Sequence, residues 1–222
     1  MDVATDVLLK GAVYALEQCG ILLRDAAELY RAKAYPSAVA LAMIGREELG
    51  KHLMLMEEWW KAESTAKPPT VEAIQDGCED HIGKQKRAVL GLAFTGDRPS
   101  AFGKAIEAQI KYKPQDAEYQ AAEKVIQECL EAMAKRAPEA RHKSRMRALY
   151  VDLDDSGSGW RRPSEVSQGE CKKLLNDAAN DYANQMRRVN PDWLRGMGKA
   201  KFADALEGWS VRPKLPEPVW VD

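Results

Sequence analysis

The chain has 222 residues, a hydrophobic fraction of 45%, a charged fraction of 30% and a formal net charge of −1. These values are typical of a globular protein with a sizeable core, and they exclude a surface that coats nucleic acid over its whole area. The N-terminus lacks a basic segment and no run of about 18 apolar residues occurs, so we expect no signal peptide, no membrane span and a cytoplasmic location. The four cysteines are widely spaced, which favours reduced core thiols over a zinc site or a disulfide framework.

Helical periodicity of the apolar residues predicts an all-α protein, folded as a helical bundle. Helices are predicted at residues 3–33, 36–62, 71–96, 100–111, 115–135 and 164–189. We also expect an interruption at Pro138 and a small extended insertion near 148–153. A short helix from Pro191 to about Gly208 and a proline-rich tail follow, so the expected division is a domain of residues 1–190 and a C-terminal part of residues 191–222.

In the second predicted helix, an apolar segment is followed directly by five ionisable residues, namely Arg46, Glu47, Glu48, Lys51 and His52. At about 100° per residue, Glu48 falls in one stripe with the apolar residues Leu41, Ile44, Leu55 and Trp59. A carboxylate half-enclosed by apolar groups beside a cation is typical of a functional site, because burial and a charged partner shift its pKa. The alternative is a solvated pair, Glu47 with Lys51, on the helix surface.

Two glycines flank this charged turn, and a glycine inside a helix costs about 1 kcal/mol relative to alanine. Close approach of another helix, from the same chain or from a second copy, would explain Gly45 and Gly50. The alternative is simple tolerance on a well-packed helix.

A local basic segment lies between residues 135 and 147, where Glu139 is the single acid. Its cations are Lys135, Arg136, Arg141, Lys143, Arg145 and Arg147. Because the chain as a whole is nearly neutral, any contact with nucleic acid would use a local patch of this kind. A solvated helix face is the alternative.

Three motifs, in this order, resemble the AbiV-type abortive-infection proteins, a branch of the HEPN superfamily. They are residues 30–51, which contain Glu47-Glu48-Leu49-Gly50-Lys51, then Asp80-His81-Ile82-Gly83-Lys84, then residues 143–152. The resemblance spans roughly residues 5 to 170. It implies a HEPN-like helical bundle that forms a homodimer with a cleft at the dimer axis, and a role in defence against phage.

Many HEPN proteins are metal-independent endoribonucleases, with a motif in which an arginine is followed a few residues later by a histidine. The pairs Arg46–His52 and Arg136–His142 both have this form, whereas the family likeness points to residues of the first two motifs. We therefore expect an endoribonuclease that acts at the dimer cleft without a metal or another cofactor. Its candidate catalytic residues are Glu48, Lys51, His81, Lys84, Glu47, Arg46 and His52.

RNA cleavage through the 2′-hydroxyl needs a base near that hydroxyl, an acid near the leaving oxygen and cations for the phosphate charge. His81 can be the base or the acid because its unperturbed pKa lies near neutrality, and Glu48 can orient it or act as base. Lys51 and Lys84 can hold the phosphate. We expect these four residues to form one cluster, and RNA to be bound by Lys143, Arg145, Arg147 and Tyr150.

Two other classes of protein remain as alternatives. A non-enzymatic helical dimer could bind a phage or host protein, with a structural charged cluster in which His81 is a core histidine bonded to a carboxylate. A carboxylate-bridged metal protein would need repeated Glu-x-x-His pairs, and the chain has only Glu139-Ala140-Arg141-His142, so this class is disfavoured.

Overall fold

The computed structural model of the chain describes residues 1–92, 105, 108–109, 112, 115–153, 156–196, 200–208 and 214–222. The helix predicted at residues 100–111 lies mostly outside these ranges. The described residues are mostly helical with one small hairpin, which confirms the all-α fold class. None of the described helices is long and apolar enough to cross a membrane.

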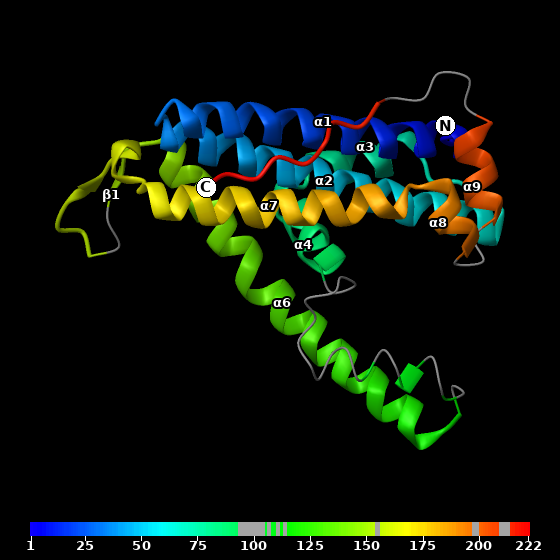
Figure 1. Cartoon of the computed structure of the whole chain (residues 1–222). Helices are drawn as coiled ribbons and strands as arrows, with labels where there is room; N and C mark the ends of the chain where they lie inside the picture. The colour runs from blue at the N-terminus through cyan, green and yellow to red at the C-terminus, as the bar shows by residue number, and fades with distance from the viewer. Residues whose placement is uncertain are drawn as a thin grey trace.

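The centre of the fold is a long antiparallel pair of helices, α1 (Thr5–Arg31) and α2 (Tyr35–Thr65). Pro36 lies in the first turn of α2. Backbone N–H groups of a first turn have no acceptor within the helix, so the missing N–H of proline removes no helical hydrogen bond. Helix α7 (Gln168–Arg188) runs alongside both (Figure 1). The buried faces of these three helices form most of the core, with side chains such as Leu8, Leu16, Met43, Leu175 and Tyr182.

Two further helices contact α2, namely α4 (His81–Leu92) and α6 (Ala117–Leu149). Figure 1 shows α6 as one long oblique helix, with its C-terminal part at the bundle and its N-terminal part extending away from it. The predicted interruption at Pro138 is wrong, because the helix continues through this position. A proline removes one helical N–H but ends a helix only where its neighbours cannot continue it, and the sequence around Pro138 is rich in alanine and glutamate.

The single helix predicted at residues 71–96 is also wrong, because the chain leaves the helical conformation at Asp80. The break separates α3 (Val71–Glu79) from α4. The Asp80 side chain accepts a hydrogen bond from the backbone N–H of Gly83 at 2.8 Å, which is the geometry of an N-cap. A Cβ atom at Gly83 would overlap the Asp80 carboxylate, so the glycine makes room for this cap.

The predicted extended insertion is shorter than expected. Helix α6 continues to Leu149, and the strand β1 (Asp152–Leu153) pairs in antiparallel register with β2 (Trp160–Arg161). This hairpin and a short 3-10 helix, η1 (Pro163–Glu165), connect α6 to α7.

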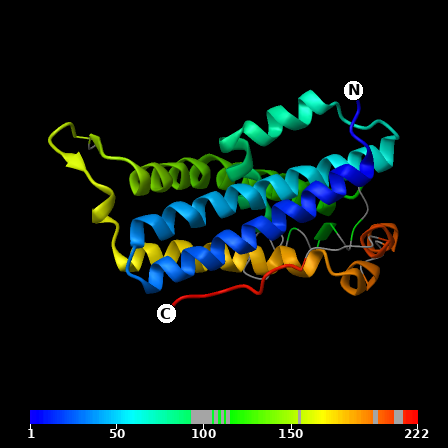
Figure 2. The same ribbon diagram turned by 90° about the horizontal axis from the view of Figure 1, so that it is seen from above.

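The C-terminal part packs on the same core as the rest of the chain. Two helices, α8 (Pro191–Gly196) and α9 (Ala200–Glu207), replace the single short helix that we predicted. In α9, the ring of Phe202 lies 5.0 Å from that of Trp59. The tail lies beside α7 and α1 (Figure 2), where Asn176 hydrogen-bonds both backbone groups of Val221. The division at residue 190 stays a prediction.

Candidate active site

The carboxylate of Glu47 lies where α2, α4 and α6 meet. Its side chain is 5% exposed, and it accepts a hydrogen bond from Nδ1 of His81 at 2.7 Å. Its other oxygen accepts from the guanidinium of Arg145 at 2.6 Å. The amide of Gln85 lies 3.5 Å from that oxygen and donates to the carbonyl of Met43. A buried carboxylate therefore holds an imidazole and a guanidinium from two other helices.

The contact with Glu47 fixes the protonation pattern of the His81 ring. A carboxylate only accepts hydrogen bonds, so Nδ1 carries the proton and Nε2 of a neutral ring is an acceptor. The His81 side chain is 54% exposed, although its partner is buried. The imidazole is thus held by one nitrogen and accessible from solvent, as proton transfer to or from a substrate requires.

The motif Asp80-His81-Ile82-Gly83-Lys84 explains how His81 is positioned. Asp80 caps α4, so His81 is the first residue of that helix. The buried ammonium of Lys84 donates to the backbone carbonyl of Cys78 at 2.6 Å, near the end of α3, where a cation is favourable. Lys84 therefore holds the junction of α3 and α4 together.

Gly50 brings α4 against α2. A Cβ atom at this position would overlap the backbone carbonyl of Lys84, so the close approach expected from the sequence occurs within the chain. Gly45 differs, because its Cβ would lie 3.5 Å from the nearest atoms, an ordinary contact.

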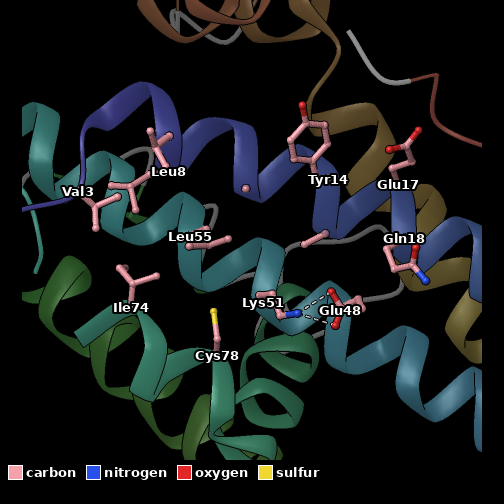
Figure 3. Close-up of a pocket in the computed structure, with 13 residues that line it drawn as sticks. Val3, Leu8, Tyr14, Glu17, Gln18, Glu48, Lys51, Leu55, Ile74 and Cys78 are labelled. Atoms are coloured by element: carbon pink, nitrogen blue, oxygen red, sulfur yellow. Dashed lines mark hydrogen bonds and ion pairs between the residues drawn. The ribbon is translucent and has the colours of Figure 1, made fainter. Parts of the chain in front are cut away.

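Glu48 and Lys51 form a separate ion pair. The Lys51 ammonium lies 2.6 and 2.8 Å from the two Glu48 oxygens, and both residues line a cavity of about 570 Å³ between α1, α2 and α3 (Figure 3). His81 binds Glu47, and Lys84 binds a carbonyl, so the four expected residues do not share one hydrogen-bond network. The alternative of a solvated Glu47–Lys51 pair is not what forms, since Glu47 is buried and Lys51 pairs with Glu48.

Arg46 and His52 lie in the core. Arg46 is 1% exposed and pairs with Asp181 of α7, and His52 donates from Nδ1 to the carbonyl of Ala12 at 2.8 Å. Neither side chain of the Arg46–His52 motif reaches the surface. Sequence reasoning missed Asp181, although its place in a buried stripe with Ala178, Tyr182 and Gln185 was a signal.

The basic segment is divided between the core and the surface. Arg141 and Arg145 point into the bundle, and burial together with the nearby Arg46 lowers the pKa of Arg141 to about 10. Lys143 and Arg147 line a second cavity, beside the hairpin. Tyr150 is exposed. The side chains of Lys135 and Arg136 lie outside the described residues, and with them the first half of the Arg136–His142 motif.

The thiols of Cys19, Cys78 and Cys171 are free. In the ranges that the structure describes, no group of three or more His, Cys, Asp or Glu side chains is arranged to hold a metal ion.

The fold and the site therefore define the class of protein: a helical bundle with a carboxylate–histidine pair between its helices. The chain belongs to the AbiV family of HEPN proteins, because the family model described as AbiV matches residues 7–184. This is an abortive-infection family that acts in phage defence. No curated protein and no solved structure matches the chain.

Proposed function

We propose that the protein defends against phage as a metal-independent endoribonuclease, with Glu47 and His81 as its catalytic pair. The observation that carries this proposal is the combination of a buried Glu47 carboxylate with an exposed His81 imidazole at 2.7 Å. More than half of the His81 side chain is exposed, so a substrate can reach the ring while Glu47 holds it. An acid–base group positioned in this way contributes roughly 10² to 10⁴ to a rate.

In this mechanism, Nε2 of His81 accepts the proton of a ribose 2′-hydroxyl. The oxygen attacks the adjacent phosphorus, and the bond to the 5′-oxygen breaks. The products carry a 2′,3′-cyclic phosphate and a 5′-hydroxyl. Glu47 stabilises the imidazolium that forms and holds the ring in place, as the buried carboxylate of a catalytic triad does.

Arg145 supplies the positive charge of the site. One of its nitrogens binds Glu47, and its Nε is buried without a hydrogen-bond partner among the described residues. The Arg145 side chain is 16% exposed beside the catalytic pair, where its positive charge can stabilise the charge that develops on the phosphate.

The proposal includes a homodimer. Cleavage requires a base for the 2′-hydroxyl and an acid for the leaving 5′-oxygen, and the pair described above supplies one proton-transfer group. A second copy, placed about a shared cleft, would supply the same group again. Sedimentation of the purified protein tests this part of the proposal.

Purified protein incubated with RNA in the presence of a chelator tests the activity. We expect fragments with 2′,3′-cyclic phosphate ends, and no cleavage where the RNA carries 2′-O-methyl groups. Fragments with 3′-hydroxyl ends, or equal cleavage of the methylated RNA, would exclude the mechanism.

The alternative function is capture of a phage or host protein, and one observation favours it. The cavity beside Glu48 and Lys51 is open and largely apolar, and Tyr14 and Val7 are exposed at it. Such a surface can receive the apolar side chains of a protein segment. Under this alternative, Tyr14→Asp abolishes phage protection and His81→Ala preserves it.

A further inference from the structure

The tail of the chain, residues 214–222, is bound along α1 and α7 (Figure 2) and contains neither helix nor strand. Pro216 lies close to Gly20 of α1, and the hydroxyl of Tyr30 donates to the backbone oxygen of Asp222 at 2.7 Å. Six tail residues thus advance along ten residues of α1, a distance of about 15 Å at the helical rise of about 1.5 Å per residue. The tail is therefore an extended segment that runs in the direction of α1.

Four side chains of α1 and α7 donate or accept hydrogen bonds from the tail, and they define the tail-binding surface: Tyr30, Asn176, Asn180 and Tyr182. The amide of Asn176 bonds both backbone groups of Val221, each at 2.9 Å. The hydroxyl of Tyr182 donates to the backbone carbonyl of Pro216 at 2.8 Å. Because these contacts are made to the backbone, they do not depend on which side chains the bound segment carries.

Two positions of the tail are recognised by their side chains. The indole N–H of Trp220 donates to the side-chain oxygen of Asn180 at 2.9 Å, and Val221 is 5% exposed. The surface therefore selects an extended segment in which an aromatic donor precedes a small apolar residue.

The prolines of the tail favour this mode of binding. Pro216 and Pro218 restrict the backbone to extended conformations, so less conformational entropy is lost when the segment binds. Proline-containing extended segments are a common form of peptide ligand for the same reason.

The tail is held without a backbone ladder and with little burial. Val221 is the only one of its nine residues that is fully buried, and Trp220, its largest side chain, is 49% exposed. A segment with few buried contacts can leave its surface while the helices stay folded. The hydrogen-bonding groups of the surface are then available to another segment.

We propose that the tail-binding surface is a recognition site for an extended segment of another protein, and that the tail is an intramolecular ligand that this segment displaces. The partner segment carries proline and an aromatic donor followed by a small apolar residue. The tail competes through its linkage, which gives an effective concentration of the order of millimolar, and a partner that adds contacts elsewhere can exceed this advantage.

The tail of a second copy has the same chemistry but gains no contact that the chain's own tail lacks, and it has no advantage of linkage. A different protein is therefore the favoured occupant, and exchange of tails between copies is an outcome of the test. The inference involves neither Glu47 nor His81, so it holds or fails independently of RNA cleavage.

A fluorescein-labelled peptide of residues 215–222 is the probe, and its fluorescence anisotropy with the full chain is the measurement. Val221→Asp in the protein places a charge at the buried position and so frees the surface from the tail. We expect this variant to bind the peptide at least roughly tenfold more tightly than the wild type, in which the linked tail competes.

Two substitutions, each added to the Val221→Asp chain, form a matched pair. Asn176→Leu removes both backbone hydrogen bonds and should weaken peptide binding roughly tenfold or more. Gln18→Leu removes an exposed amide at the cavity that Glu48 and Lys51 line, and it should leave the affinity unchanged.

The wild type gives a second measurement that needs no substitution. Endoproteinase Lys-C cleaves after lysine, and Leu215 must leave its packing against the core before the bond after Lys214 can enter the protease. Excess labelled peptide should speed the release of residues 215–222 several-fold, as followed by mass spectrometry. A peptide with Trp220→Ala and Val221→Asp should not.

Three results would overturn the inference: equal peptide binding by the wild type and Val221→Asp, unchanged binding after Asn176→Leu, or a Lys-C rate that the peptide does not alter. If Val221→Asp does not fold, the Lys-C measurement on the wild type decides alone. A wild-type dimer that Val221→Asp converts to a monomer would assign the surface to the tail of a second copy, and would also overturn it.

Discussion

The imidazole of His81 and the carboxylate of Glu47 are 34 positions apart in the sequence and meet at 2.7 Å. They meet because Asp80 ends α3 and starts α4 at His81, and because Gly50 allows the backbone of α4 to lie directly against α2. The geometry of the pair therefore depends on the contact between these two helices.

The two glycines of α2 give a matched test of that contact. Gly50→Ala is expected to push α4 away, to lower the free energy of unfolding by about 1–3 kcal/mol and to reduce RNA cleavage, because a Cβ overlaps the Lys84 carbonyl. Gly45→Ala should be neutral or stabilising by up to about 1 kcal/mol, because its Cβ has room and alanine favours a helix. Denaturant unfolding of both variants checks this, and equal effects would contradict it.

A pH-dependent stability is expected from Asp181. Burial raises its pKa from 3.8 to about 6, although Arg46 and Arg141 lower it. The folded chain thus binds this proton more tightly than the unfolded chain, and the resulting stability is lost as the pH rises from about 4 to about 6. Asp181→Asn lowers the free energy of unfolding at both pH values. The loss should be smaller at pH 7 than at pH 4, by up to about 3 kcal/mol.

Denaturant titrations of the wild type and of Asp181→Asn at both pH values provide the measurement. A difference between the two proteins that is the same at pH 4 and pH 7 would show that the carboxyl has an ordinary pKa.

The Glu48–Lys51 pair should not be required for cleavage. Lys51→Met removes a half-buried ion pair that includes neither Glu47 nor His81, so we expect RNA cleavage within a few fold of wild type and a change in unfolding free energy of about 1 kcal/mol or less. Initial rates under saturating RNA, with Lys61→Met as an exposed control on α2, check this. A loss as large as that of a His81 variant would restore the four-residue cluster that the sequence predicted.

Much of the fold could be predicted because long amphipathic helices have a strong periodic signal. Helix α1 and the charged turn of α2 were found in this way. The break at Asp80 was missed because the apolar periodicity of α3 and α4 continues across it, and only the cap between Asp80 and Gly83 reveals it. The uninterrupted α6 was missed because Pro138 was given more weight than the helix formers around it.

The site could be predicted in part. Sequence reasoning named Glu47, His81 and Arg145, but it joined His81 to Glu48, because only the stripe on α2 was visible. Which of two adjacent carboxylates faces a partner helix depends on the tertiary packing, and Glu47 faces α4 and α6. The pairing of Arg46 with Asp181 could not be predicted for the same reason, because Asp181 lies on α7, far along the sequence from α2.

Single-turnover cleavage of RNA at saturating protein, measured for His52→Ala, His81→Ala and His142→Ala, tests the central claim most directly. We expect His81→Ala to lose roughly a hundredfold or more in rate, with a smaller fall in thermal midpoint than His52→Ala, because the ring is largely exposed and the buried Glu47 keeps its hydrogen bond from Arg145. His52→Ala should lower the midpoint, since it removes a buried hydrogen bond. His142→Ala should cleave at a near wild-type rate once RNA is bound. Full activity in His81→Ala together with a loss in His142→Ala would contradict the catalytic role of the Glu47–His81 pair and would place the chemistry at the Arg136–His142 motif.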